Sequence, residues 1–262
     1  MLGSTGVNSR NTVSKHVWKV VKKIAKLLPK LVSSCFDISS LSRNHYIVLT
    51  LDFLLCQVKW SHRYKCNKNL KTGYKYRTCK VTVDCTDCPI NEPLPLTGAR
   101  LKLFGKKDPM WFSEKMNHAG VRYEVAVCIR TGEIVWVNGP FPCGEKNDIA
   151  IFRSKLKGKL DEGEMVEADN GYGGEGKTVR KKCEYVSRAD KAAKSLALAR
   201  HETINSNLKK WKILSVAYCH NKDTHCIVFS AIIVPTQLGY NRGEKPFQVK
   251  YYFFGITRVN KI

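Results

Sequence analysis

Three acidic residues stand at the ends or on the faces of expected secondary structure elements. Asp84 closes an alternating apolar run, Asp169 closes a short apolar and acidic run, and Glu202 lies in a long helix-forming stretch. An α/β sheet gathers strand ends at one edge, so two carboxylates there and one from a flanking helix could hold a pair of Mg²⁺ or Mn²⁺ ions. Two such ions activate a water and stabilise the leaving 3′ oxygen of a phosphodiester. These residues therefore indicate phosphoryl transfer without a protein nucleophile.

A phosphate-binding loop competes with this interpretation in the same part of the chain. Residues 171–178, GYGGEGKT, match the pattern G-x-x-x-x-G-K-T of nucleotide hydrolases. Such a loop requires a helix that starts at its Lys-Thr pair, so that the helix N-terminus faces the phosphates. The following residues VRKKCEYV show no amphipathic pattern. We therefore expect a turn that exposes Asp169 and no nucleotide binding, with a phosphate-loop NTPase as the alternative.

Cysteine and histidine pairs offer a second metal-ligand pattern. Their types and the spacing of the histidine pair suit Zn²⁺. The residues concerned are Cys85, Cys88, Cys219, His220, His225 and Cys226. However, the first pair lies far from the others in sequence and directly follows Asp84. The sequence therefore favours buried cysteines over a zinc site.

Composition restricts the class of protein. The chain has 262 residues with 43% apolar content, enough for one sizeable core. Its formal net charge is +23, and residues 1–80 hold 16 basic and only 2 acidic residues. This excess favours polyanionic partners. The 11 cysteines come without an apparent secretory signal, and the apolar run 46–58 is broken by Asp52, so we expect a reducing intracellular compartment and no membrane span.

The basic front of the chain contains two segments that could contact nucleic acid. Residues 12–32 predict an amphipathic helix. Its apolar side could pack on the rest of the protein with the lysines facing solvent, or the lysines could contact a DNA backbone or a membrane surface. The lysines that we expect to contact DNA are Lys19, Lys22, Lys23 and Lys26. Residues 59–80 interleave basic and aromatic side chains, which suits phosphate contact and base stacking, although a solvated loop fits as well.

The rest of the chain alternates strand and helix patterns. The sequence predicts a strand, a hairpin turning at Thr131-Gly132, a helix capped by Asn147 or Asp148, a second strand and a long helix. The expected ranges are 80–85, 121–140, 148–160, 164–169 and 190–214. The apolar faces expected for the two helices are Ile149, Phe152, Leu156 and Leu160, and Leu196, Ala199, Ile204, Leu208 and Trp211. This order predicts an α/β fold.

Four blocks in this region resemble the catalytic domain of PIF/Harbinger-type DDE transposases. The blocks are VDCTDCPI (83–90), FSEKMNHAGVRYEVAVCIRTGEIVWVNGPFPCG and the following ND (112–148), VEADNGY (166–172) and RHETINSNLKKW (200–211). The resemblance covers about residues 80–250. It implies a ribonuclease H-like mixed sheet flanked by helices, with Asp84, Asp169 and Glu202 as the metal-holding catalytic acids. It also implies an auxiliary role for Asp148 and a DNA contact for Lys209, two helical turns after Glu202.

The resemblance implies a metal-dependent DNA endonuclease or transposase located in the nucleus. We expect a basic segment at residues 1–79 and a catalytic domain at residues 80–262. Because no complete helix-turn-helix precedes the core, a separate DNA-binding partner protein is expected, and an oligomer is compatible with the sequence. Residues 36–79 do not resemble the family, and Leu198 stands where an arginine is common. A domesticated or decayed DNA-binding protein without catalysis is therefore the alternative function.

Overall fold

A computed structural model describes the greater part of the region with strand and helix patterns. The described residues are 58–66, 78–93, 108–180, 188–244 and 246–249. The chain divides after Cys56 into two units, and all described residues belong to the second, Gln57–Ile262. The expected amphipathic helix at residues 12–32 and its four lysines lie outside the described residues.

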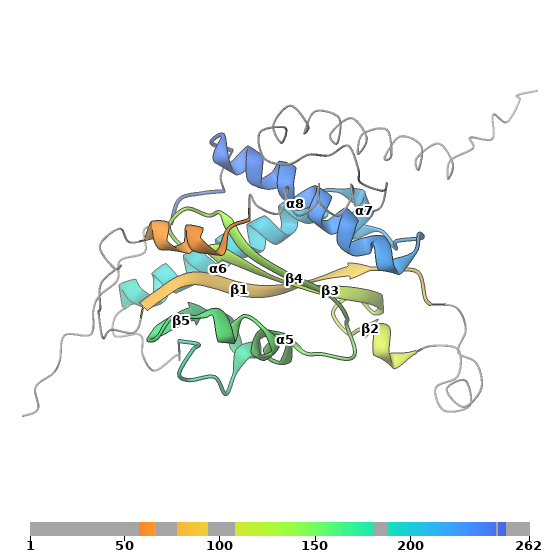
Figure 1. Ribbon diagram of the computed structural model, residues 1–262, viewed down its shortest axis with the longest axis horizontal. Helices are drawn as coiled ribbons and strands as arrows, with labels where there is room; N and C mark the ends of the chain where they lie inside the picture. Colours follow the sequence, from red (N-terminus) through yellow and green to blue (C-terminus); the bar gives the residue numbers. More distant parts are fainter. Residues whose placement is uncertain (1–57, 67–77, 94–107, 181–187, 245, 250–262) are drawn as a thin grey trace, which may run out of the picture. The chain divides into compact units, whose positions relative to one another are not determined.

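Five strands form one mixed sheet (Figure 1). They are β1 (Thr78–Pro89), β2 (Phe112–Ser113), β3 (His118–Cys128), β4 (Ile134–Pro142) and β5 (Glu164–Glu167). The main order is β4-β3-β1-β5, and β2 pairs with the first residues of β3. Strand β3 runs antiparallel to β1 and β4, whereas β5 runs parallel to β1. The predicted hairpin is confirmed, and Gly132 in its turn has a φ of 72°, which favours glycine.

Helices cover both faces of the sheet (Figure 1). The α-helices are α5 (Asp148–Ser154), α6 (Arg188–Lys209), α7 (Lys212–Ser215) and α8 (His225–Asn241). Short 3-10 helices are η1 (Trp60–Cys66), η2 (Pro109–Trp111), η3 (Lys157–Lys159), η4 (Asn170–Tyr172) and η6 (Lys222–Thr224). Figure 1 shows α5 on one side of the sheet and α7 and α8 on the other. The predicted α/β fold is therefore confirmed as a mixed sheet flanked by helices.

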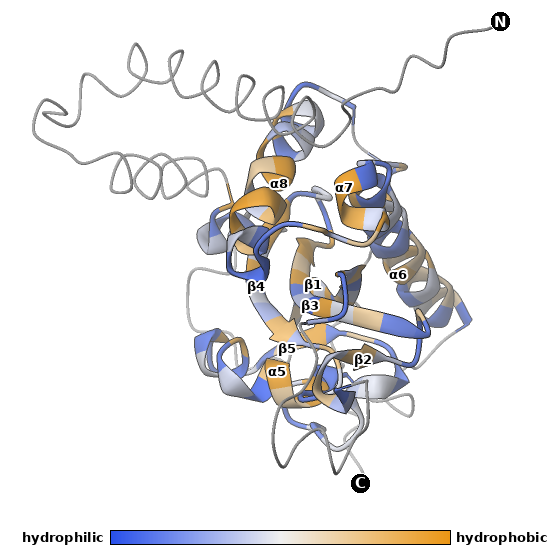
Figure 2. Cartoon of the chain, turned by 90° about the vertical axis from the view of Figure 1, so that its right-hand side faces the viewer, coloured by the Kyte–Doolittle hydropathy of each residue, from blue (hydrophilic) through white to orange (hydrophobic). Residues whose placement is uncertain are grey.

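The apolar core has one layer on each face of the sheet (Figure 2). On one face, Val83 of β1 packs in a cluster with Phe152 of α5. On the other face, Val125 of β3 belongs to a cluster with Leu208 of α6 and Phe229 of α8. Alternate residues of a strand point to opposite faces, so β1 and β3 supply both layers. Each fully buried side chain of this size contributes roughly 1.5–3 kcal/mol.

Helix α5 begins at its predicted cap and ends earlier than predicted. The Asn147 side chain accepts a hydrogen bond from the backbone N–H of Ala150 at 3.0 Å. The helix ends at Ser154, because Lys155 has a φ of −143° and leaves the helical conformation. Phe152 and Leu156 are buried as predicted, although Leu156 follows the end of the helix.

Helix α6 buries only part of the predicted apolar face. Ile204 and Leu208 are buried as expected, but Leu196 and Trp211 are 48% and 49% exposed. Two polar residues, Arg200 and His201, take the buried positions instead. Arg200 donates to the backbone carbonyls of Cys128 and Ile129, and His201 Nδ1 lies 2.8 Å from Thr82 Oγ1. These hydrogen bonds offset the cost of burying the two polar side chains. Trp211 is exposed because it lies beyond the end of α6, at Lys209.

Part of the basic and aromatic segment packs into the core. Arg63 in η1 is 2% exposed and its Nε donates to Glu164 at 3.0 Å. The Trp60 ring packs edge-on against Trp136, with ring centroids 6.0 Å apart. The expectation of a DNA-contacting or solvated side chain is therefore wrong for Arg63. The ion pair with a buried carboxylate explains why the arginine is buried.

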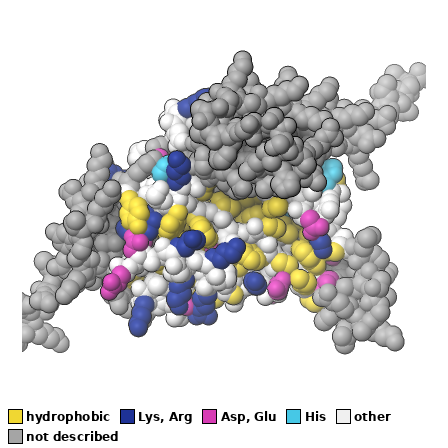
Figure 3. Space-filling view, in the orientation of Figure 1, with side chains coloured by type: hydrophobic (Ala, Val, Ile, Leu, Met, Phe, Trp, Pro, Cys, Tyr) yellow, Lys and Arg dark blue, Asp and Glu magenta, His cyan; other side chains and the backbone are white. Residues whose placement is uncertain are grey.

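Figure 3 shows one face of the described unit, on which Lys and Arg side chains gather below a band of apolar side chains.

No helix in the part of the chain that the structure describes is long and apolar enough to cross a membrane.

Candidate active site

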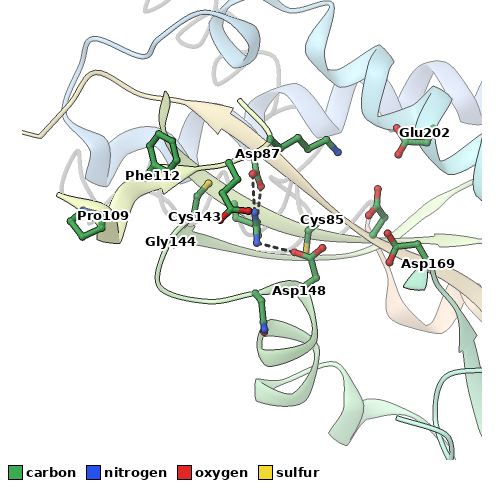
Figure 4. A pocket seen from close by; sticks show the side chains of 14 residues that line it. Cys85, Asp87, Pro109, Phe112, Cys143, Gly144, Asp148, Asp169 and Glu202 are labelled. Carbon is green, nitrogen blue, oxygen red and sulfur yellow. Dashed lines mark hydrogen bonds and ion pairs between the residues drawn. The ribbon is translucent and has the colours of Figure 1, made fainter. Parts of the chain in front are cut away.

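A cleft of about 900 Å³ opens at the edge of the sheet (Figure 4). Four sequence-predicted acids line it: Asp84, Asp148, Asp169 and Glu202. Figure 4 shows Asp169 and Glu202 at one side of the view and Asp87 nearer its middle, with Pro109 and Phe112 at the opposite side. Acids that lie up to 118 positions apart in the sequence therefore share one cavity.

Strand β1 positions Asp84 differently from the sequence prediction. Asp84 does not close the strand, because β1 continues to Pro89 and pairs with β3 as far as Gly120. On its other side, β1 pairs with β5 only as far as Thr82, opposite Glu167. Asp84 therefore follows the last residue of β1 that pairs with β5, where the cleft begins.

The Asp84 carboxyl has an unfavourable electrostatic environment. Its pKa is raised to about 7, mainly by burial and further by the negative charges of Glu202 and Asp169, while Lys115 acts in the opposite direction. Asn205 Nδ2 donates to Asp84 Oδ2 at 3.0 Å. Asn205 lies three residues after Glu202, on the same side of α6. One turn of α6 thus supplies both Glu202, which lines the cleft, and Asn205, which orients Asp84.

Asp169 is held by the turn that follows β5. The strand ends at Glu167, and Asp169 Oδ1 accepts from the backbone N–H of Gly171 at 2.8 Å. A Cβ atom at Gly171 would lie 3.0 Å from Asp169 Oδ1 and 3.8 Å from Asp148 Oδ2. Glycine therefore leaves open space between two carboxylates. Glu202 is exposed on α6, and no hydrogen bond of its side chain occurs within the described ranges.

Asp148 belongs to a paired cluster in the same cleft. Arg122 donates from Nε to Asp87 Oδ1 at 2.7 Å and from Nη2 to Asp87 Oδ2 at 2.9 Å. Its Nη1 lies 3.0 Å from Asp148 Oδ1. Ser113 Oγ donates to Asp87 Oδ2 at 2.6 Å. Burial raises the pKa of Asp87, but the bonds from Arg122 and Ser113 outweigh it, so the pKa is lowered.

The donor types in the cleft fit a hard divalent cation. Carboxylate oxygens suit Mg²⁺ or Mn²⁺, and the space beside Gly171 adjoins two of them. The mutual repulsion at Asp84 is the condition that a bound cation relieves. Within the described ranges, however, no three Asp, Glu, His or Cys side chains converge closely enough to form a metal-ligand group. The acids share a cleft, but their carboxylates do not lie close enough together to form a metal-binding group.

The cysteine and histidine pairs are dispersed. Cys85 packs with Tyr172, with its sulfur 3.5 Å from the tyrosine hydroxyl, whereas Cys88 belongs to the core layer on the other face. His225 is buried, and its Nδ1 lies 2.8 Å from Tyr123 Oη. Cys219 is exposed. Cys85, Cys88 and His225 therefore belong to the core, and within the described ranges these cysteines and histidines form no common metal-ligand group.

The phosphate-loop pattern lacks its helix. The backbone N–H of Val166 donates to Thr178 O at 2.8 Å, and that of Arg180 donates to Val166 O at 3.1 Å. Residues 178–180 therefore run beside β5 in an extended conformation, and Lys177 does not open a helix. The geometry required for cradling phosphates on a helix N-terminus is absent from this described stretch.

Several residues of the cleft were missed by sequence reasoning. Arg122, Lys115 and Asp87 line the cavity, and Asn205 holds Asp84. The position of Asn205 one turn after Glu202 is the one available signal. Lys209 is half-buried and does not line the cleft, so its expected DNA contact stays a prediction.

A comparison of the sequence with protein-family models identifies the family to which this chain belongs. The family model described as "DDE superfamily endonuclease" matches residues 83–234. The chain belongs to the DDE superfamily endonucleases. The matched segment contains the four sequence-predicted acids of the cleft and implies DNA as the substrate. Searches of curated proteins and of solved structures gave no match. DDE endonucleases generally use divalent metals, in agreement with the oxygen donors of this cleft.

Proposed function

We propose that this DDE endonuclease cleaves DNA phosphodiester bonds in the manner of a transposase, with Asp84, Asp169 and Glu202 holding the metal ions. The observation that carries the proposal is the single cleft into which β1, the turn after β5 and α6 bring these three acids. When bound, Mg²⁺ or Mn²⁺ would activate the attacking water and stabilise the leaving 3′ oxygen. The freed 3′ hydroxyl would then attack target DNA.

The residues of the chain have separate tasks in this proposal. Asn205 orients the Asp84 carboxylate through its 3.0 Å hydrogen bond. The Gly171 N–H fixes Asp169, and Gly171 keeps the adjoining space open. Arg122 fixes Asp148 beside them, so Asp148 has an auxiliary electrostatic role.

We also propose a ribonuclease H-like core and the PIF/Harbinger type within the family. The strand order β4-β3-β1-β5, with antiparallel pairs followed by a parallel strand and helices on both faces, supports the core assignment. The four sequence blocks support the subtype. Nuclear location and a separate DNA-binding partner protein remain part of the proposal. So do DNA contacts by Lys19, Lys22, Lys23, Lys26 and Lys209, for which the net charge of +23 is the support.

Nicking of supercoiled plasmid tests the proposal. The wild-type protein should convert supercoiled DNA to open circles in Mg²⁺ or Mn²⁺ and should stop when a chelator is added. Binding of DNA without nicking in either metal would instead support a domesticated or decayed DNA-binding protein. Labelled ATP should not bind, and micromolar binding abolished by Lys177→Ala would favour the phosphate-loop alternative.

A further inference from the structure

Among the described residues, two basic side chains line the catalytic cleft, Lys115 and Arg122. Arg122 donates from Nε to Asp87 Oδ1 at 2.7 Å, and its Nη1 lies 3.0 Å from Asp148 Oδ1. Lys115 is exposed, and its ammonium group forms no hydrogen bond or ion pair with any residue that the structure describes. The charge of Arg122 is therefore used within the protein, whereas a substrate can contact the ammonium group of Lys115.

The side chains of the cleft together carry negative charge. Its described lining contains six acids and two bases. The acids are Asp84, Asp87, Glu114, Asp148, Asp169 and Glu202. No excess of positive side chains therefore attracts a DNA phosphate into this cleft, and the divalent cations of the proposed function are needed to offset the acids. Lys115 can determine where a bound phosphate lies, but it does not supply the overall attraction.

Lys115 lies near Asp84 without pairing with it. Its positive charge acts on Asp84 and opposes the increase in the pKa of that acid. Both side chains line the cleft, and within the described part they form no ion pair with each other. Open space therefore separates the ammonium group from the acid beside which the proposed reaction takes place. A phosphate oxygen suits this space, because an ammonium group offers three N–H donors and bonds strongly to an anionic acceptor.

The turn that carries Lys115 is attached to the paired acids of the cleft. Ser113, the last residue of β2, donates from Oγ to Asp87 Oδ2 at 2.6 Å, and the same Oγ accepts from the backbone N–H of Met116 at 3.4 Å. The chain enters β3 after Asn117, whose φ of 51° lies in the left-handed region that asparagine tolerates. These contacts hold the main chain on both sides of Lys115, whose side chain lines the cleft.

We propose that Lys115 is a further catalytic residue, which donates a hydrogen bond to a nonbridging oxygen of the DNA phosphate that is cut. The proposal rests on the proposed endonuclease function, because it places the reacting phosphate in the same cleft. A fixed cation at the phosphate oxygens stabilises the charge of the transition state more than that of the bound substrate. Lys115 forms no covalent bond in this role. The water oxygen forms the new bond to phosphorus, and the 3′ oxygen leaves.

The rate of plasmid nicking tests the role of Lys115. Lys115→Met keeps the length of the side chain and removes its charge. The rate at saturating plasmid should fall by about a hundredfold or more, as is usual when one donor to a transition-state oxygen is removed. The half-saturating plasmid concentration should change by less than about threefold, since one phosphate contact among several contributes little to affinity. Lys115→Arg keeps a charged donor and should nick within about tenfold of the wild-type rate.

Thermal unfolding with Mg²⁺ distinguishes Lys115 from a metal ligand. The positive charge of Lys115 repels a cation beside Asp84, so Lys115→Met should keep the stabilisation by Mg²⁺ and reach it at an equal or lower Mg²⁺ concentration. A variant of a ligand, such as Asp169→Asn, should lose this stabilisation. Its loss in Lys115→Met would show that Lys115 acts through the metal site and would overturn the proposal. Unfolding in chelator checks that each variant is folded.

Lys210→Met is the matched control, because Lys210 is exposed and does not line the cleft. It should keep the wild-type nicking rate and the response to Mg²⁺, and a loss equal to that of Lys115→Met would overturn the proposal. Nicking by Lys115→Met at the wild-type rate would overturn the role of Lys115 alone, whether or not the affinity for plasmid falls. If the wild type does not nick in either metal, the endonuclease function and the role of Lys115 are both wrong.

Discussion

Two groups of acids line the same cleft and differ in how their charge is balanced. Asp87 and Asp148 face Arg122, and Asp87 also accepts from Ser113, so the pKa of Asp87 is lowered. Asp84 has an amide partner and no cation at hydrogen-bond distance in the described part. Burial, together with the charges of Glu202 and Asp169, raises its pKa to about 7. An acid that is paired with a cation stabilises the metal-free fold, whereas acids that repel one another can still bind a metal cation.

Neutralising an acid of the repelling group should have the largest effect, and the effect should be on function. Asp169→Asn should reduce metal-dependent nicking by about a thousandfold or more, because several kcal/mol of metal stabilisation are lost at tenfold per 1.36 kcal/mol. The metal-free melting temperature should stay unchanged. The wild type should gain thermal stability with Mg²⁺ by mass action, and the variant should not. Plasmid nicking and thermal unfolding measure both outcomes.

Asp223→Asn is the matched control for this experiment, since Asp223 is exposed and lies outside the cleft. It should keep nicking and the stabilisation by Mg²⁺. If Asp169→Asn instead destabilises the metal-free protein and keeps the response to Mg²⁺, Asp169 is a structural capping residue.

Breaking the paired group should cost stability. Arg122→Met leaves Asp87, with 2% side-chain exposure, without its cation, and the free energy of unfolding should fall by about 3 kcal/mol. Arg153→Met removes an arginine whose side chain is 50% exposed and should cost less than about 1 kcal/mol. Urea unfolding with chelator present measures both. Equal losses would show that burial does not distinguish the two ion pairs.

Asp84 and Asp87 should also respond to pH with opposite signs. Asp84 has a raised pKa of about 7, so the metal-free fold loses stability as the pH rises from about 4 to about 7. Asp84→Asn removes this loss and should be more stable than wild type at pH 8 by about 1 kcal/mol or more. Asp87 has a lowered pKa, so its contribution is present above about pH 4 and is lost as the pH falls through the folded pKa.

Asp87→Asn should therefore be less stable than wild type at pH 8, and the difference should shrink in acid. Urea unfolding of both variants at pH 4, 6 and 8 in chelator provides the comparison. Differences of the same sign at Asp84 and Asp87 would contradict the distinction between the two groups.

The smallest effect is expected at the amide that orients Asp84. Asn205→Ala should weaken apparent Mg²⁺ affinity by about tenfold, as is usual for residues that hold a metal ligand in place. Asn207→Ala is the control on the same helix, because Asn207 bonds to Tyr240 at 3.3 Å and lies outside the cleft. Titration of thermal stability with Mg²⁺ measures the affinity. An equal effect at Asn207 would make Asn205 merely structural.

The sequence correctly predicted the features that depend on a single strand, helix or turn. The strand alternation, the Asn147 cap and the Thr131-Gly132 turn are local patterns, and each element is found. The joint placement of Asp84, Asp169 and Glu202 follows from strand ends and a flanking helix, although β1 continues beyond Asp84 because β3 keeps pairing with it. Such continuation depends on the neighbouring strand and is invisible in the alternation itself.

Contacts between distant side chains could not be predicted. Asn205 and Asp84 are 121 positions apart, and Arg63 and Glu164 are 101 apart. Hydrophobic periodicity assigns polar residues to solvent, so it placed Leu196 inside and overlooked Arg200 and His201. Their burial is decided by backbone carbonyls and a hydroxyl of the sheet, which no helical pattern encodes.

The 3-10 helix η1 packs on the sheet although it precedes the segment that matches the family model. The family match begins at residue 83, yet Arg63 and Lys80 lie before it and contact Glu164, whose side chain is 1% exposed. Glu164 opens β5, the strand whose other end leads to Asp169. The segment that matches the family model is therefore smaller than the unit in which these side chains pack. A fragment that begins at residue 83 would lack Arg63 and Lys80, the cations beside Glu164, and also the β1 residues 78–82 that pair with β5, the strand that leads to the cleft.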